Sequence, residues 1–289
     1  MINIIGAAVG SGGPDTKAAE GPDVVAHSDY WKELANQHST IKWIDTLYEQ
    51  KQTNKLDILC EIFGKLAIAV KNQVKQKNRF CVIGGDHSAA IGTWSGASAG
   101  INGDPLGLIW IDAHEDAHTF ETTPSGKVHG MPVAALLGYG SERLTQIAHA
   151  APKILPQNLC LIGIRSFEPG EHKLLQDLQV KIYPIEVVKE RGISTVLQEA
   201  REYVSRNTSG YGITLDIDGI DPKDAPGVST PEPDGIRSED LLKALTQIYP
   251  DPKQIGFEIM EFNPSNDINK KTEQLICQIL KILATGETA

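Results

Sequence analysis

Short apolar runs alternate along the chain with longer segments in which apolar residues recur every three or four positions. The short runs are rich in Ile, Val and Leu and predict buried strands, at Ile2–Ala8, Arg79–Ile83, Gly107–Ile111, Leu159–Ile164, Gly212–Leu215 and Gln254–Glu258. The helical spacing predicts helices at Lys55–Lys75, Gly170–Leu178, Ile193–Ser205, Ser238–Tyr249 and Thr272–Ala284. Alternation of strand and helix predicts an α/β fold, a three-layer sandwich with a central parallel sheet flanked by helices.

The chain length fits one domain of this kind. Its 289 residues exceed the usual domain size, but α/β folds often run longer as a single unit. A chain of this size buries roughly three quarters of the surface that its unfolded form exposes, so one core suffices. Because no repeat, low-complexity tract or linker interrupts the alternation, we expect residues 1–289 to form a single domain.

Charge and cysteine content narrow the possible partners and compartment. The formal net charge of -10 argues against nucleic acid, because phosphate binding needs clustered Lys and Arg. No segment has the ~18 consecutive apolar residues of a membrane helix, and the N-terminus lacks the basic region of an export signal. Each cysteine lies in an apolar stretch without a C-x-x-C motif, which favours buried free thiols. We therefore expect a protein of the reducing cytoplasm that binds neither nucleic acid nor membrane. The cysteines are Cys60, Cys81, Cys160 and Cys277.

Acidic residues and histidines cluster directly after predicted strands. The segments Gly84–Ser88 (GGDHS), Asp112–Asp116 (DAHED) and Asp216–Asp218 each follow or close a strand. Glu168 and Glu261 lie just beyond two more. Ligands of open parallel sheets bind beyond the carboxyl ends of the strands. The sequence therefore predicts a site at one edge of the sheet to which five strand ends contribute.

These clusters predict a dinuclear metal site. Alternate residues of an extended backbone point the same way, so we expect Asp112, His114 and Asp116 to converge. A lone Asp-x-His or Asp-x-Asp is typical of a turn or cap, but three such motifs after strands favour metal. Four carboxylates without counterions would raise one another's pKa values, whereas two divalent cations would cancel their charge. Oxygen-rich donors with two imidazoles favour manganese over zinc. The predicted ligands are His87, Asp112, His114, Asp116, Asp216 and Asp218.

At these residues the chain resembles a known family. GGDHS, DAHED and LDIDGIDP, in that order, resemble the signature segments of the arginases and related ureohydrolases. The segment SGKVHGMP, Ser125–Pro132, is closer to arginases than to agmatinases. The likeness extends from IIGAAV near the start to EIMEFNP near the end, which implies an arginase-like catalytic domain across the whole chain.

The resemblance implies roles for several residues. Two manganese ions would activate a water that attacks the carbon of a guanidino group, and for L-arginine the products would be L-ornithine and urea. His129 would transfer protons, as a histidine of near-neutral pKa can, and Asp116 would pass on a proton. Glu261 would hold the guanidinium, and Thr230 would line the pocket. Asp86 and Glu258 are expected to orient metal ligands. The resemblance also implies a homo-oligomer, a trimer or a hexamer.

The residues expected at the outer end of the substrate depart from the family pattern. The arginine enzymes of the family carry asparagines where His118 and Lys127 stand, and an aspartate at Glu168, while Ser125 is retained. Lys127 still donates to a carboxylate, but with a longer stem. Glu168 reaches about 1.5 Å further, enough to matter for positioned chemistry. The substrate is therefore expected to be L-arginine or another guanidino acid, such as guanidinobutyrate or guanidinopropionate.

Two other functions are compatible with this fold. A deacetylase-type enzyme would use one zinc and need only the Asp-x-His pair and a later Asp. The additional ligands His87, Asp116 and Asp218 argue against it. A non-catalytic family member would predict a gap among the ligands or at His129, and the sequence has none.

Overall fold

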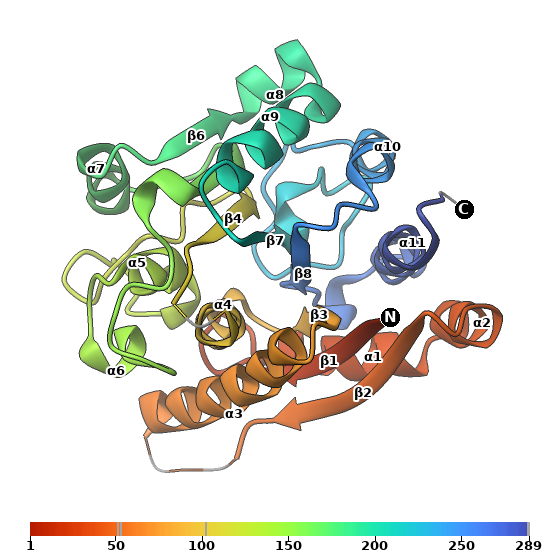
Figure 1. Ribbon diagram of the computed structural model, residues 1–289, viewed down its shortest axis with the longest axis horizontal. Helices are drawn as coiled ribbons and strands as arrows, with labels where there is room; N and C mark the ends of the chain where they lie inside the picture. The colour runs from red at the N-terminus through yellow and green to blue at the C-terminus, as the bar shows by residue number, and fades with distance from the viewer. Residues whose placement is uncertain (51, 53, 102, 288–289) are drawn as a thin grey trace.

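The apolar runs of the sequence form the centre of one sheet. The computed structural model describes residues 1–50, 52, 54–101 and 103–287. The eight strands of the sheet are all parallel and follow the order β2-β1-β3-β8-β7-β4-β5-β6 (Figure 1). Their bounds are β1 Ile2–Ala8, β2 Ile41–Tyr48, β3 Arg79–Gly84, β4 Leu106–Ile111, β5 Leu159–Ile164, β6 Lys181–Pro184, β7 Gly210–Asp216 and β8 Gln254–Met260. The predicted parallel sheet is thereby confirmed, and the six predicted strands are its six inner strands.

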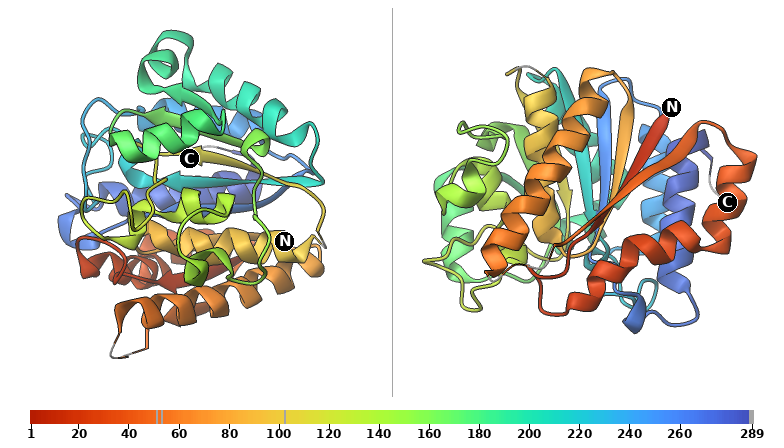
Figure 2. Two further views of the ribbon diagram at one scale, coloured as in Figure 1. Left: turned by 90° about the vertical axis from the view of Figure 1, so that its left-hand side faces the viewer. Right: turned by 90° about the horizontal axis from the view of Figure 1, so that it is seen from below.

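Helices cover both faces of the sheet (Figures 1 and 2). One apolar core lies under α1 Gly21–His27, α2 Asp29–Gln37, α8 Ile185–Arg191, α9 Ile193–Ser205, α10 Ser238–Ile248 and α11 Lys271–Thr285. A second core lies under α3 Lys55–Lys75, α4 Ala90–Gly100, α5 Pro132–Leu137, α6 Glu142–Thr145 and α7 Pro169–Asp177. Successive residues of β4 alternate between the two cores, with Ile109 and Ile111 in the first and Leu108 and Trp110 in the second. This alternation gives the three layers that the sequence predicts.

Helix α4 has no exposed face, which explains why its periodicity gave no signal. It lies between α3 and the sheet, and nearly all of its side chains are buried. Glycines allow the close contact with α3, since a Cβ at Gly96 would overlap the backbone of Ala67. A helix that is buried on every side, here with small and apolar residues all round, lacks the strongly polar face by which a surface helix is recognised.

The cysteines are free, as expected. Three are buried, and Cys60 is half-buried. Among the described residues, no helix combines the length and apolar character that crossing a membrane requires.

Candidate metal centre

His87 is positioned by a tight turn at the end of β3. A Cβ at Gly85 would overlap the backbone oxygen of Val9, so only glycine allows this approach. Asp86 then accepts the backbone N–H groups of Gly12 and Gly13, at 2.9 and 3.1 Å. The loop after β1 and the turn after β3 are thereby joined at the carboxyl edge of the sheet.

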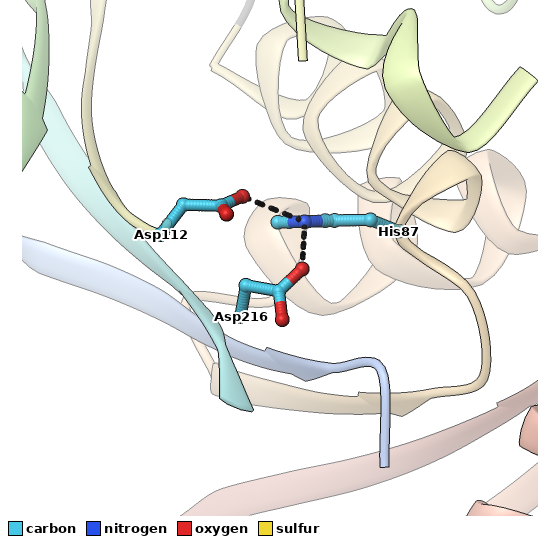
Figure 3. A group of neighbouring side chains, drawn as sticks. All are labelled: His87, Asp112 and Asp216. Atoms are coloured by element: carbon cyan, nitrogen blue, oxygen red, sulfur yellow. Dashed lines mark hydrogen bonds and ion pairs between the residues drawn. The ribbon is translucent and has the colours of Figure 1, made fainter. Parts of the chain in front are cut away.

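The first group of candidate ligands surrounds one nitrogen of His87. Its Nδ1 lies 2.8 Å from Oδ2 of Asp216, 3.2 Å from Oδ2 of Asp112 and 3.3 Å from Oδ2 of Asp116. Figure 3 shows both Asp112 and Asp216 turned toward this imidazole. All four residues are buried. Three carboxylate oxygens and one imidazole nitrogen can therefore hold a single cation.

The second group lies beside the first and shares Asp112 with it. Nδ1 of His114 lies 3.2 Å from Oδ2 of Asp218 and 3.5 Å from Oδ1 of Asp112. Asp112 therefore presents one oxygen to each histidine. The ligand atoms within each of two triads, His87–Asp112–Asp216 and Asp112–His114–Asp218, lie within 4.8 Å of one another. The structure thus brings all six residues predicted as ligands into two adjoining groups.

The charge of these residues fits two divalent cations. In the described part of the chain, neither a lysine nor an arginine pairs with any of the four aspartates. Burial and the neighbouring Asp112 raise the pKa of Asp116 to about 8. Burial, Asp218 and Asp112 likewise raise the pKa of Asp216 far above its ordinary value. One oxygen of Asp218 is buried and has no hydrogen-bond partner among the described residues. Bound divalent cations would offset this charge and stabilise such a donor set.

A hydrogen-bond chain fixes the other nitrogen of His87. Nε2 of His87 lies 3.1 Å from the hydroxyl of Thr214, and that hydroxyl donates to Oε2 of Glu258 at 2.6 Å. The indole of Trp94 donates to the same oxygen at 2.8 Å. With Nε2 protonated toward Thr214, the lone pair of Nδ1 is free for a cation. Glu258 is thus connected to His87 through the single hydroxyl of Thr214.

A second tryptophan supports the shared carboxylate. Trp110 stacks on His87, with ring centroids 4.2 Å apart and 13° between the planes. Its indole N–H donates to Oδ2 of Asp112 at 2.8 Å. Trp110 lies on β4, two residues before Asp112, which directly follows the strand. The side chains of the two residues therefore point to the same face of the sheet. Trp94, Trp110 and Thr214 were missed by the sequence analysis, although Thr214 stands in the same alternation with Asp216.

The backbone bends at two site residues. Asp116 has φ of 48° and Glu261 has φ of 64°, in the left-handed region. The extended backbone assumed for Asp112, His114 and Asp116 is therefore wrong at Asp116, whose backbone is left-handed, although its carboxylate still reaches the site. Such conformations cost on the order of 1–3 kcal/mol and are held where the surroundings require them.

Glu261 and His129 lie next to the first group. Glu261 accepts the backbone N–H of His87 at 2.8 Å through Oε1, which also lies 3.5 Å from Nδ1 of His129. The other oxygen of Glu261 is buried and has no hydrogen-bond partner in the described structure. Burial lowers the pKa of His129, but Glu261, Asp116 and Asp86 outweigh it and raise the pKa to about 9. A carboxylate oxygen and a proton donor thus adjoin the metal ligands.

The residues expected at the outer end of the substrate contact one another. Nε2 of His118 lies 2.9 Å from Oε2 of Glu168 and 3.4 Å from Oε1 of Glu171, and Nδ1 lies 3.1 Å from the hydroxyl of Thr122. Glu168 precedes α7 and forms a capping box with Glu171. Burial raises the pKa of Glu171 to about 9. Glu171 was not singled out by the sequence analysis, and its position three residues after Glu168 was the available signal.

The remaining three candidates differ in their surroundings. The hydroxyl of Thr230 donates to Oδ2 of Asp218 at 2.9 Å, so Thr230 lies directly against a candidate ligand. Nζ of Lys127 is 3.4 Å from the backbone oxygen of Gly13. Ser125 is exposed, and its hydroxyl accepts the N–H of Lys127 at 3.2 Å.

Fold and site together define an α/β enzyme with a dinuclear type of metal centre at the carboxyl edge of a parallel sheet. A model of the arginase family matches residues 1–285. The chain belongs to the arginase family. Membership of this family, with the ligand groups above, makes it a hydrolytic enzyme of the ureohydrolase type.

Individual relatives agree over nearly the whole chain. The arginase of Bacillus caldovelox is 37% identical over 290 residues, which cover 96% of each protein. The crystal structure of arginase from Bacillus subtilis superposes with a TM-score of 0.91 at 34% identity, over 99% of this chain and 98% of that one. The arginase of Entamoeba histolytica in complex with L-ornithine has the same TM-score, 0.91, at 28% identity, over 98% and 97% of the two chains.

Proposed function

We propose that this protein is a manganese hydrolase that cleaves the guanidino group of L-arginine to give L-ornithine and urea. The observation that carries the proposal is the pair of histidine–aspartate groups that share Asp112. Oxygen-rich donors with two imidazoles suit manganese. The relatives named arginases, one of them a complex with L-ornithine, support arginine as the substrate.

Bound manganese would supply a water of lowered pKa and neutralise the charge of the carboxylates. Side chains around it would bind and orient the substrate. Glu261 has a buried, unpartnered oxygen that suits a guanidinium N–H. His129, next to Glu261, can give a proton to the departing amine. Asp116, facing Nδ1 of His87, can take up the proton of the attacking water.

Metal content and urea release test this proposal together. Protein reconstituted with manganese should bind two ions per chain and release urea from L-arginine. Asp112→Asn removes the carboxylate common to both groups and should abolish both properties. Glu239→Gln, a change on the exposed face of α10, is the matched control and should leave both intact. A protein that holds two manganese ions yet releases urea from no guanidino compound would refute the proposed reaction.

The pairing of His118 with Glu168 favours a second candidate substrate. By the family resemblance, Glu168 stands where a carboxylate meets the α-ammonium of arginine, but here His118 already lies 2.9 Å from it. Lys127 remains available for a substrate carboxylate. Guanidinobutyrate or guanidinopropionate, which have a carboxylate and no α-ammonium, would suit this arrangement.

Comparison of kcat/KM for arginine and for guanidinobutyrate decides between the two candidates. If Glu168 is occupied by His118, then His118→Asn should raise the arginine-to-guanidinobutyrate ratio. Lys127→Met should reduce the use of both compounds, since both carry a carboxylate. A wild-type preference for arginine that His118→Asn leaves unchanged would eliminate the second candidate.

We also propose that residues 1–289 act as one catalytic domain, assembled as a cytoplasmic homo-oligomer, a trimer or a hexamer. The free state of all four cysteines supports a reducing compartment. The family resemblance supports the oligomer. Light scattering of the purified protein gives its assembled mass directly, and a monomer at working concentration would contradict this part.

A further inference from the structure

The two candidate metal-binding histidines differ in how their outer nitrogens are held. Nε2 of His87 is hydrogen-bonded to Thr214 in the core, and only 1% of the His87 side chain is exposed. The side chain of His114 is 25% exposed, and its Nε2 lies 3.7 Å from Oε1 of Glu232. Glu232 therefore stands on the opposite side of the His114 ring from Asp112 and Asp218.

Glu232 is held in this position by its neighbours. The hydroxyl of Ser166 donates to Oε1 of Glu232 at 3.1 Å. Ser166 is itself fixed beside His114, because the two residues form a parallel bridge beyond β4 and β5. Pro231 and Pro233 flank Glu232 and restrict the backbone on both sides.

Arg165 connects this loop to a candidate ligand of the second group. Its Nη2 donates to the backbone oxygens of Glu232 and Asp218, at 2.9 and 2.8 Å. Its Nε donates to the backbone oxygen of Pro233 at 3.0 Å, and Nη1 reaches that of Gly219 at 3.3 Å. One planar guanidinium thus fixes the backbone of Asp218 relative to that of Glu232.

We propose that Glu232 is a positioning residue for the metal ion held by His114 and Asp218. Its carboxylate attracts the proton on Nε2 of His114, which leaves the lone pair on Nδ1, the nitrogen that faces Asp112 and Asp218. A carboxylate behind a metal-binding histidine fixes the tautomer and the ring orientation, and its loss typically weakens metal binding ~10–100-fold. The inference rests on the proposed dinuclear function and assigns Glu232 to one ion of the pair.

A direct metal titration tests this assignment without substrate. Manganese would be added to metal-free wild type, Glu232→Ala and Glu232→Gln, with binding followed by calorimetry and by the electron paramagnetic resonance signal of coupled manganese pairs. Glu232→Ala should weaken one of the two binding steps ~10–100-fold and leave the other unchanged. Glu232→Gln, which keeps a side-chain oxygen, should weaken the same step less.

Asp234→Asn is the matched control. Asp234 lies on the same loop, is exposed, and adopts a left-handed backbone conformation that asparagine tolerates. The Asp234→Asn substitution removes one negative charge from the loop, as Glu232→Ala does, but leaves Glu232 in place behind His114. Both binding steps should therefore be as in wild type. Circular dichroism and thermal melting of each metal-free variant check that the fold is retained.

The outcomes separate this inference from the proposed function. If wild type binds fewer than two ions, the dinuclear function itself fails. If wild type binds two and Glu232→Ala binds both with wild-type affinity, only the positioning role fails. A Glu232→Ala variant that binds metal normally but has a raised KM would indicate that Glu232 acts on substrate binding and not on the metal ion. That result would overturn the proposal. Equal weakening of both steps would also overturn it.

Discussion

Replacement of Thr214 by valine tests whether the hydrogen-bond chain behind His87 supports the site. Valine has nearly the same shape as threonine but lacks the hydroxyl that joins His87 to Glu258. All three residues are buried, so water cannot take its place. Nε2 of His87 loses its partner, whereas Oε2 of Glu258 keeps the hydrogen bond from the indole of Trp94.

The expected cost follows from the two groups left short of partners. A buried polar group that loses its hydrogen bond costs ~1–3 kcal/mol. Two such groups would cost about 2–6 kcal/mol in the free energy of unfolding. Because Glu258 retains one donor, we expect a loss of about 2–4 kcal/mol for Thr214→Val. For a domain of this size that loss lowers the melting temperature on the order of 5–10 °C. Manganese affinity should fall ~10–100-fold, because the His87 tautomer is no longer fixed.

Thermal melting with and without metal, together with manganese titration, measures both effects. Thr214→Ser is the control, since it keeps the hydroxyl and removes only a methyl group. It should lie close to wild type in metal affinity and lose less stability than Thr214→Val. If Thr214→Val melts at the wild-type temperature and binds manganese as wild type does, the chain from His87 to Glu258 has no supporting role.

Three further perturbations have expected outcomes. Removal of metal with a chelator should abolish urea release and lower the melting temperature. Added manganese should restore both properties. Full activity in metal-free protein would contradict the metal assignment. His129→Asn should slow urea release ~10–1,000-fold with both ions retained. In metal-free protein, the His129 pKa raised from 6.5 to about 9 gives at most roughly 3 kcal/mol. That stability is fully present below pH 6.5 and is lost as pH rises through about 9. The free energies of unfolding of wild type and of His129→Asn should therefore converge at high pH. Gly212→Ala would place a Cβ on the ring of Trp94 and should cost about 1–3 kcal/mol in urea unfolding, whereas a neutral result would show that the ring can move.

The inner sheet was predictable because its strands are buried on both faces. Such strands are continuous apolar runs, and each of the six predicted runs became one. The two edge strands escaped because their burial is partial. Ile41–Tyr48 mixes apolar and polar residues without a regular alternation and is half-exposed, and Lys181–Pro184 has only four residues. Their pairing depends on backbone hydrogen bonds to a neighbour that no local pattern identifies.

The candidate site was predictable where its residues follow strands and not where they depend on turns or on distant partners. His87, Asp112 and Asp216 follow or close inner strands, and the structure brings them together. The bend at Asp116 and the contact of His118 with Glu171 depend on loop geometry. A loop has no period from which its path can be read.

The order of the strands has a consequence for how the site is assembled. β8 comes after the other seven strands in the sequence, yet it lies between β3 and β7 and joins the β2-β1-β3 portion of the described sheet to the β7-β4-β5-β6 portion. His87 follows β3, whereas Asp112 and Asp216 belong to the other portion. In a nascent chain that ends before Gln254, His87 therefore lies on one part of the sheet, and Asp112 and Asp216 lie on another part that is not yet joined to it. The ion held by His87 therefore requires β8 to be in place, whereas Asp112, His114 and Asp218 all belong to the β7-β4 portion and can meet without it.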